Sequence, residues 1–199
     1  QVREYWPRAS LPSNNLWVNC MDILFQDEDL IVINKPSGLL SIQDGYHPEL
    51  PNVKKILSEK LGRVWIVHRL DKETSGSLVI ALNEKTHRFL NFQFQNHAVE
   101  KIYHAIISGS PKIDEFTIAQ PLLVNGDRKH RTMVNSDFGK PAKSIVKVLA
   151  RFPNNSLVSV IPKTGYTHQI RSHLAFSGYP ILGDRLYNPQ NVPSELLSV

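Results

Sequence analysis

The order of strand-like and helix-like segments constrains the fold of this chain more than any other feature of its sequence. Short apolar runs typical of strands follow one another, and fewer segments have the i, i+3, i+4 spacing of a helix. The predicted strands are residues 22–26, 30–34, 77–82, 102–108, 144–152 and 157–161, and the predicted helices are residues 53–61, 84–94 and 168–176. Because helices do not alternate strictly with strands, a doubly wound parallel sheet is disfavoured. The sequence instead predicts an α+β fold with a central mixed, mainly antiparallel sheet and flanking helices.

Local signals set the expected ends of these helices. Asn83 and Thr167 are expected to cap helix N-termini, because their side chains can accept a hydrogen bond from a free backbone amide. Gly62 and Gly178 are expected to end helices. The helical spacing of Val53, Ile56, Leu57 and Leu61 predicts the first of these helices. The side chains expected to face the core from the other two are Phe89, Leu90, Phe94, Ile170, Leu174 and Phe176.

Composition limits the class of protein. Hydrophobic residues make up 41% and charged residues 21% of the 199 residues, which is typical of a globular domain and not of a disordered chain. The single cysteine, Cys20, excludes an internal disulfide and any metal cluster built from several cysteines. No apolar run is long enough to span a membrane, so we expect a cytoplasmic protein without a membrane partner. We also expect a monomer.

A polar turn runs directly into the predicted strand of residues 77–82. The turn comprises residues 68–76, with the sequence HRLDKETSG, and it contains Asp71 close to Arg69. Such a turn can hold a carboxylate rigidly and expose it to a ligand. The alternative interpretation is an ion pair between Arg69 and Asp71 without function, as is common on protein surfaces.

Two further polar segments carry candidate functional side chains. In residues 165–178, His168 and Arg171 are three positions apart and would share one face of the predicted helix. The helix dipole disfavours cations in a first turn, so we expect a carboxylate or a phosphate nearby. In residues 101–105, Tyr103 lies in a predicted strand. The alternatives are a solvated basic helix face and an edge strand in which Tyr103 serves only for packing.

The positive charge of the chain is unevenly distributed. Residues 125–151 contain seven Lys and Arg residues against two Asp residues, an excess as large as the net charge of +5 of the whole chain. A basic segment of this kind predicts a surface that faces a polyanion such as RNA. The alternative is a solvated hairpin loop.

Five motifs in the same order resemble those of the RluA family of RNA pseudouridine synthases. The turn HRLDKETSG is similar to the HRLDxxTSG signature of that family. The other four motifs are INKPSG at residues 33–38, KIYHAIISG at 101–109, KPA at 140–142, and THQIR followed by GYPILGD at 167–171 and 178–184. Five ordered motifs across residues 22–187 are far more specific than any one short motif.

The resemblance implies a fold, an activity and a catalytic set. It implies the pseudouridine synthase fold with an active-site cleft, and the isomerisation of specific uridines to pseudouridine in structured ribosomal or transfer RNA. Asp71 matches the catalytic aspartate, Tyr103 matches the aromatic residue that stacks on the target base, and Arg171 matches the arginine that pairs with the aspartate. The isomerisation involves no redox change, so we expect no cofactor. The alternative is a catalytically silent RNA-binding module of the same fold.

The resemblance and the basic segment together predict the contacts to RNA. Arg69 matches a residue that contacts the RNA, and Ile170 is expected to pack against the base. The full set of predicted substrate-binding residues is Arg69, Ile170, His68, Thr74, His168, Gln169, Lys35, Arg128, Lys129 and Arg131. No metal site is expected, because His68, His168 and His173 lack a ligand spacing that includes a carboxylate. The expected partner is a stem-loop of ribosomal or transfer RNA.

The sequence also departs from the family pattern. Tyr166 stands where the family usually has Arg, so the role of that Arg is not carried over. The expected organisation is an irregular N-terminal arm at residues 1–20 and one pseudouridine synthase catalytic domain at residues 21–199. The family's N-terminal RNA-binding domain is expected to be absent, and the catalytic domain to be truncated at its C-terminus.

Overall fold

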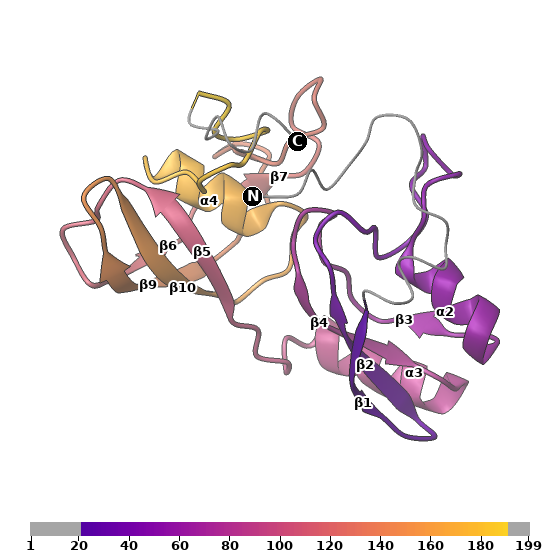
Figure 1. Cartoon of the computed structure of the whole chain (residues 1–199). Helices are drawn as coiled ribbons and strands as arrows, with labels where there is room; N and C mark the ends of the chain where they lie inside the picture. Colours follow the sequence, from indigo (N-terminus) through magenta and orange to yellow (C-terminus); the bar gives the residue numbers. More distant parts are fainter. Residues whose placement is uncertain (1–20, 191–199) are drawn as a thin grey trace, which may run out of the picture. The chain divides into compact units, whose positions relative to one another are not determined.

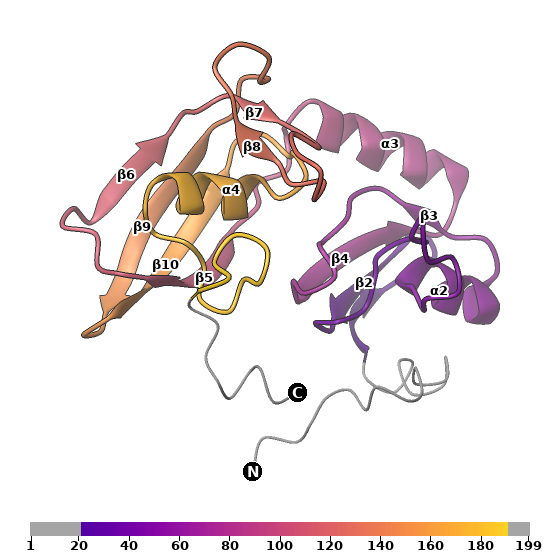
Figure 2. The same ribbon diagram turned by 90° about the horizontal axis from the view of Figure 1, so that it is seen from above.

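The computed structural model describes residues 21–190, and it divides into two compact units between Val99 and Glu100. Here the N-terminal unit means residues 21–99 and the C-terminal unit means residues 100–190. Each unit contains a four-stranded sheet and at least one helix (Figures 1 and 2). The expectations for residues 1–20 lie outside the described residues.

The N-terminal unit contains an antiparallel sheet with the strand order β1-β2-β4-β3 and two helices. Its elements are β1 (Asp22–Gln26), β2 (Leu30–Lys35), α2 (Val53–Leu61), β3 (Trp65–Ile66), β4 (Gly76–Ala81) and α3 (Glu84–Gln95). Ile33 in β2 pairs with Leu78 in β4, and both side chains are fully buried. The period-two pattern of these strands therefore directs one face of the sheet into a core.

The helices of this unit begin and end largely as the sequence predicts. The side chain of Asn83 accepts from the Thr86 backbone amide at 2.9 Å, so the predicted cap of α3 is confirmed. Gly62 ends α2 with φ of 77°, a conformation that favours glycine. Val53, Ile56 and Leu57 of α2 are buried, whereas the expectation that Phe89 of α3 faces the core is wrong, because it is 61% exposed.

The C-terminal unit contains an antiparallel sheet with the order β5-β10-β9-β6, a two-stranded sheet of β7 and β8, and one helix. Its elements are β5 (Tyr103–Ser108), β6 (Glu115–Ile118), β7 (Leu122–Leu123), β8 (Met133–Val134), β9 (Ser144–Arg151), β10 (Asn155–Pro162) and α4 (Gln169–Phe176). One face of the larger sheet forms a core with α4, whose Leu174 is fully buried among residues such as Val146 and Val158. This burial anchors the helix that carries Arg171.

The start of α4 differs from the prediction. Thr167 does not cap the helix; His168 occupies the cap position with φ of 54° and makes no side-chain capping bond. His168 therefore lies outside the helix and does not share a helical face with Arg171. Phe176 is 58% exposed, so its expected burial is also wrong. Gly178, with φ of 81°, does follow the end of the helix as predicted.

The α+β class is confirmed, but the strands are divided differently from the prediction. The described residues form two separate four-stranded sheets, one in each unit, where the sequence predicted one central sheet. All strand pairs within these sheets are antiparallel. Among the described residues, no helix has the length and apolar character needed to cross a membrane.

Candidate active site

Asp71 lies in a tight turn that leads into β4. The backbone amide of Thr74 donates to the carbonyl oxygen of Asp71 at 3.1 Å, which closes the turn. The strand begins two residues later at Gly76, whose φ of 129° is accessible mainly to glycine. Gly76 pairs with Lys35, so the turn lies beside the end of β2.

The backbone on both sides of Asp71 is hydrogen-bonded to the segment that follows β2. Ser41 lies before the helix α2 and is almost fully buried. The contacts are Ser41 Oγ to the Leu70 carbonyl (2.8 Å), the Leu70 amide to Ser41 Oγ (3.1 Å), the Gly38 amide to the Lys72 carbonyl (2.8 Å) and Ser37 Oγ to the Glu73 carbonyl (2.8 Å). These bonds use backbone groups of the turn, so they fix its path without using the Asp71 carboxylate.

Lys35 is buried beneath this turn. Its side chain is 0% exposed, and Nζ donates to the carbonyl oxygens of Pro36 (2.8 Å), Leu39 (2.7 Å) and Lys72 (3.1 Å). An ammonium group has three donors, and three carbonyls meet them. These bonds give Lys35 a structural role, one of the two roles, structural or phosphate-binding, that are open to a lysine before Pro36: the side chain points into the protein and holds the turn.

Burial controls the charge state of Lys35. It lowers the pKa of the Lys35 ammonium to about 8, while the charges of Glu73 and Asp71 act in the opposite direction. The group thus carries a positive charge at neutral pH within electrostatic reach of Asp71.

The other predicted residues of this unit have different surroundings. Nε2 of His68 accepts from the Val79 amide at 3.0 Å, and its ring stacks on Phe94 with centroids 4.5 Å apart. The His68 side chain thus accepts a hydrogen bond from the backbone of β4 at a position just past the end of β3. This structural role was missed by the prediction. Arg69 is exposed and Thr74 is half-buried.

Arg171 is held by a buried carboxylate in the C-terminal unit. Arg171 Nε donates to Asp184 Oδ2 at 2.7 Å, and Nη2 donates to Asp184 Oδ1 at 2.9 Å. The Asp184 side chain is only 4% exposed and the Arg171 side chain 21%. Burial alone would raise the pKa of Asp184, but the hydrogen bond and charge of Arg171 lower it below its usual value. Asp184 is therefore one carboxylate of the kind expected near this helix.

Tyr103 and Ile170 lie on the core side of the same unit. Tyr103 is the first residue of β5, pairs with Val160 and is half-buried. Ile170 packs partly buried against the core cluster of the larger sheet. Its core contacts explain its apolar character without a base, and its predicted stacking on RNA stays a prediction.

Gln169 is a structural residue, contrary to the prediction that it binds RNA. It is 3% exposed, and both ends of its side-chain amide are engaged. Its partners are the Thr164 hydroxyl (2.8 Å) and the Tyr166 amide (3.2 Å) at Oε1, and the Lys143 carbonyl (3.0 Å) and Ser144 Oγ (3.1 Å) at Nε2. The side chain therefore joins the start of α4 to β9.

His173 continues this network and is fully buried. Nε2 of His173 lies 2.9 Å from the Gln120 carbonyl, and Nδ1 lies 2.9 Å from Ser144 Oγ. Because a carbonyl can only accept, Nε2 carries the proton and Nδ1 accepts from the serine. Burial lowers the pKa of His173, which keeps this neutral arrangement at physiological pH.

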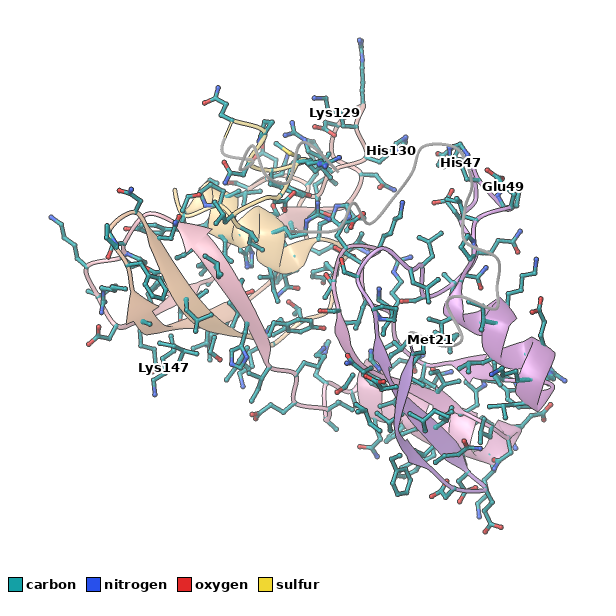
Figure 3. All side chains as sticks on the ribbon, in the orientation of Figure 1. Met21, His47, Glu49, Lys129, His130 and Lys147 are labelled. Carbon is teal, nitrogen blue, oxygen red and sulfur yellow. The ribbon has the colours of Figure 1, made fainter. Side chains whose placement is uncertain are left out.

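The basic segment is not one surface. The loop of residues 124–132 between β7 and β8, here called the basic loop, exposes Arg128 and Lys129. In Figure 3, Lys129 and His130 lie at this loop, and Lys147 lies far from them on β9. Arg131 does not extend toward solvent in the same way, because its Nε donates to Asp127 at 2.6 Å. Arg131 is thus bonded within the loop, and its contact with RNA stays a prediction.

The described residues contain no group of three or more His, Cys, Asp or Glu side chains that could hold a metal ion.

Comparison with known proteins places the chain in a family. Residues 29–176 match the family described as RNA pseudouridylate synthase. The dual-specificity RNA pseudouridine synthase RluA of Pasteurella multocida is 38% identical over 170 residues, which cover 85% of this chain and 78% of that protein. The enzyme of the same name from Escherichia coli is 36% identical over 166 residues, which cover 83% of this chain and 76% of that protein.

Solved structures agree with this placement. Human RNA pseudouridylate synthase domain containing 1 is 27% identical, with a TM-score of 0.72 over 84% of this chain and 69% of that one. Human RNA pseudouridylate synthase domain containing 4 is 28% identical, with a TM-score of 0.72 over 89% of this chain and 72% of that one. The match to the family covers most of the chain, and it includes the motifs that surround Asp71, Tyr103 and Arg171. The chain therefore belongs to the RNA pseudouridylate synthase family, among the relatives of RluA, and is an isomerase that acts on RNA.

Proposed function

We propose that this protein converts uridine to pseudouridine in stem-loops of ribosomal or transfer RNA, with Asp71 as the reacting carboxylate. The observation that carries the proposal is the turn around Asp71, whose backbone is bonded on both sides to residues 37–41. A turn fixed through its backbone holds the residue that it carries in one position. Such support is what a catalytic carboxylate requires.

The chemistry is an isomerisation in which atoms and electrons balance. The bond from C1′ of the ribose to N1 of uracil breaks, the base turns, and a bond from C1′ to C5 forms. C5 loses its hydrogen as a proton, and N1 gains a proton. Asp71 serves either as the nucleophile that attacks the sugar or as the base that removes a sugar proton, and both roles require its ionised form.

Three further side chains have a role in this proposal. Lys35 is a buried cation that holds the turn through the Lys72 carbonyl. Arg171 supplies a cation for the reaction, and Tyr103 supplies an aromatic face for the uracil ring. Base–aromatic stacking contributes about 1–3 kcal/mol per base, enough to hold a uridine that has left its own stack.

The proposed substrate class follows from the cost of extracting the base. A uridine must leave its stack to react, and this costs less in a loop than in a duplex. Several relatives, such as that of Pasteurella multocida, are named dual-specificity RNA pseudouridine synthases, and one from Borreliella burgdorferi is named a ribosomal large subunit pseudouridine synthase. We therefore propose that the substrate is a stem-loop of ribosomal or transfer RNA, and that the protein acts as a monomer.

Substitution of Asp71 tests the proposal directly. Transcripts of transfer RNA and ribosomal RNA fragments, labelled with tritium at uracil C5, release the label as the new bond forms. Asp71→Asn should abolish this release and should preserve the fold, because the bonds that hold the turn come from its backbone. Asp44→Asn is a matched control in the same unit, since Asp44 accepts from the amides of Tyr46 and His47 and has no proposed role in the reaction.

The outcomes separate the enzyme from the silent module. Tritium release by Asp71→Asn within tenfold of the wild type would contradict the role of Asp71. RNA binding by the wild type without any release from any transcript would favour the RNA-binding module. Mapping pseudouridine in total RNA, with and without the gene, then identifies the target uridine.

A further inference from the structure

Tyr187 connects three parts of the C-terminal unit that lie far apart in the sequence. Its ring lies under the guanidinium group of Arg171, with 5.1 Å between Cζ and the ring centroid. Its hydroxyl lies 3.2 Å from Nδ1 of His168, the residue that precedes α4. The same hydroxyl accepts from the Thr132 amide at 2.8 Å and donates to the Thr132 carbonyl at 3.0 Å. Thr132 is the last residue of the basic loop.

The hydrogen-bonding capacity of the Tyr187 hydroxyl is filled. A phenol has one donor and two acceptor positions. The donor serves the Thr132 carbonyl, and the acceptor positions serve the Thr132 amide and a proton on His168 Nδ1. Thr132 is fully buried, so its backbone depends on this hydroxyl. The hydroxyl therefore has a structural role in joining the loop to the start of α4.

The ring of Tyr187 has a separate role from its hydroxyl. Asp184 holds one edge of the Arg171 guanidinium through Nε and Nη2, and the Tyr187 ring covers one of its faces. Both partners come from one turn, because Asp184 Oδ1 also accepts from the amides of Leu186 and Tyr187. Hydrogen bonds along one edge still allow the guanidinium plane to tilt about that edge. An aromatic ring packed on one face of the guanidinium limits this tilt.

We propose that Tyr187 is a positioning residue for Arg171, and that its ring sets the orientation in which the guanidinium acts. The inference rests on the proposed role of Arg171 in the reaction. In this inference, loss of the Tyr187 ring lowers the reaction rate, and loss of the Tyr187 hydroxyl lowers the stability of the C-terminal unit. The two contributions are separable because different substitutions remove them.

Two substitutions of Tyr187 test this division. Tyr187→Phe removes the hydroxyl and keeps the ring, so it should lower the melting temperature and leave the single-turnover rate at saturating RNA within about twofold of the wild type. Tyr187→Leu removes both and should lower that rate about tenfold, the size of one partly desolvated cation–π contact. The dissociation constant for the RNA should change less than the rate. Tritium release from the labelled transcripts provides the rate.

Tyr179→Leu is the matched control for loss of stability. Tyr179 is a half-buried tyrosine of the same unit, and it packs against the core cluster and Phe116. Its substitution should lower the melting temperature without lowering the saturated rate. If the rates of Tyr187→Phe, Tyr187→Leu and Tyr179→Leu simply follow their melting temperatures, the positioning role is overturned.

A double variant separates failure of this inference from failure of the proposed function. In the Arg171→Met background, Tyr187→Leu should lower the residual rate no further, because the ring acts through Arg171. A further tenfold loss would contradict the inference. A wild-type rate for Arg171→Met would overturn the proposed role of Arg171 and this inference with it. An inactive Arg171→Met with a fully active Tyr187→Leu would overturn only the inference.

Discussion

The two units hold their proposed catalytic residues in different ways. In the N-terminal unit, Lys35 and residues 37–41 bond to backbone groups on either side of Asp71. In the C-terminal unit, Asp184 and Tyr187 contact the side chain of Arg171 itself. The bonds to backbone groups on either side of Asp71 do not use its carboxylate, so they can remain when that side chain is replaced. A residue placed through its side chain leaves a buried partner behind when it is replaced.

The largest expected effect on stability is therefore that of Arg171→Met. It leaves the Asp184 carboxylate, 4% exposed, without its cation. Removing one member of a buried ion pair costs about 3–5 kcal/mol, and we expect a loss of this size in the free energy of unfolding. Denaturant unfolding of Arg171→Met and of Asp71→Asn gives the two losses in the free energy of unfolding, and their difference compares the two kinds of support.

The double variant Arg171→Met with Asp184→Asn is the control for this prediction. Removing the carboxylate charge as well should restore part of the lost stability. Equal stability of Arg171→Met and Asp71→Asn would show that the two residues are held alike, and would break the comparison.

Lys35→Met should have a smaller effect, and it tests the support of the Asp71 turn. It removes the donor from three carbonyls, and a buried group left unsatisfied costs about 1–3 kcal/mol. We expect a loss of this size at pH 7, together with slower tritium release. Lys54→Met is the control, because Lys54 is exposed on α2 and its loss should change stability by less than about 0.5 kcal/mol.

The pH dependence of stability identifies the charge of Lys35. Its pKa is about 8 in the folded protein against 10.5 as the ordinary value, so the folded state binds fewer protons between these pH values. The free energy of unfolding therefore gains a contribution from Lys35 as the pH rises from about 8 to 10.5. This rise should be present in the wild type and missing in Lys35→Met. Parallel pH profiles of the two proteins would contradict the assignment.

The smallest expected effect on the fold lies in the basic loop. Arg131 is held by Asp127, whereas Arg128 and Lys129 are exposed. Replacing Arg128 and Lys129 by Ala should leave stability nearly unchanged and should reduce the slope of log affinity against log salt by about 1.4, at about 0.7 per phosphate contact on single-stranded RNA. Lys147→Ala is the control, because Lys147 lies away from the loop on β9 (Figure 3). An unchanged slope for the double variant would place the RNA elsewhere.

Much of the local structure was predictable because its signals are local. Strands β1 and β2, the helices α2 and α3, the Asn83 cap and the Gly62 end all depend on neighbouring residues. The start of α4 was predicted wrongly. His168 and not Thr167 occupies the cap position, in a left-handed conformation, and its ring lies beside the hydroxyl of Tyr187, 19 positions further along the chain. The exposure of Phe89 and Phe176 was also missed, since periodicity alone does not show how much of a helix face is covered.

The roles of three residues that were predicted to contact RNA also depend on contacts that only the folded structure shows. The motif residues Lys35, His68 and Gln169 are polar and lie beside the catalytic motifs, so the sequence suggested that they bind RNA. In the structure each of them bonds to backbone groups of its own unit. A polar residue in a motif can thus either bind the RNA or stabilise the backbone near the residues that bind it. Its position in the sequence does not distinguish these two roles.

The sequence by itself determined the family, the α+β class and the motifs that carry Asp71, Tyr103 and Arg171, because these depend on residue type and order. Only the tertiary structure decided which groups hold them. Asp184 is 13 positions from Arg171, Thr132 is 55 from Tyr187, and Ser41 is 29 from Leu70. Such contacts form when folding brings distant backbone and side-chain groups within hydrogen-bonding distance and removes water from them. Buried donors and acceptors must then pair with the groups that lie next to them in space. A local sequence pattern does not show which groups these are.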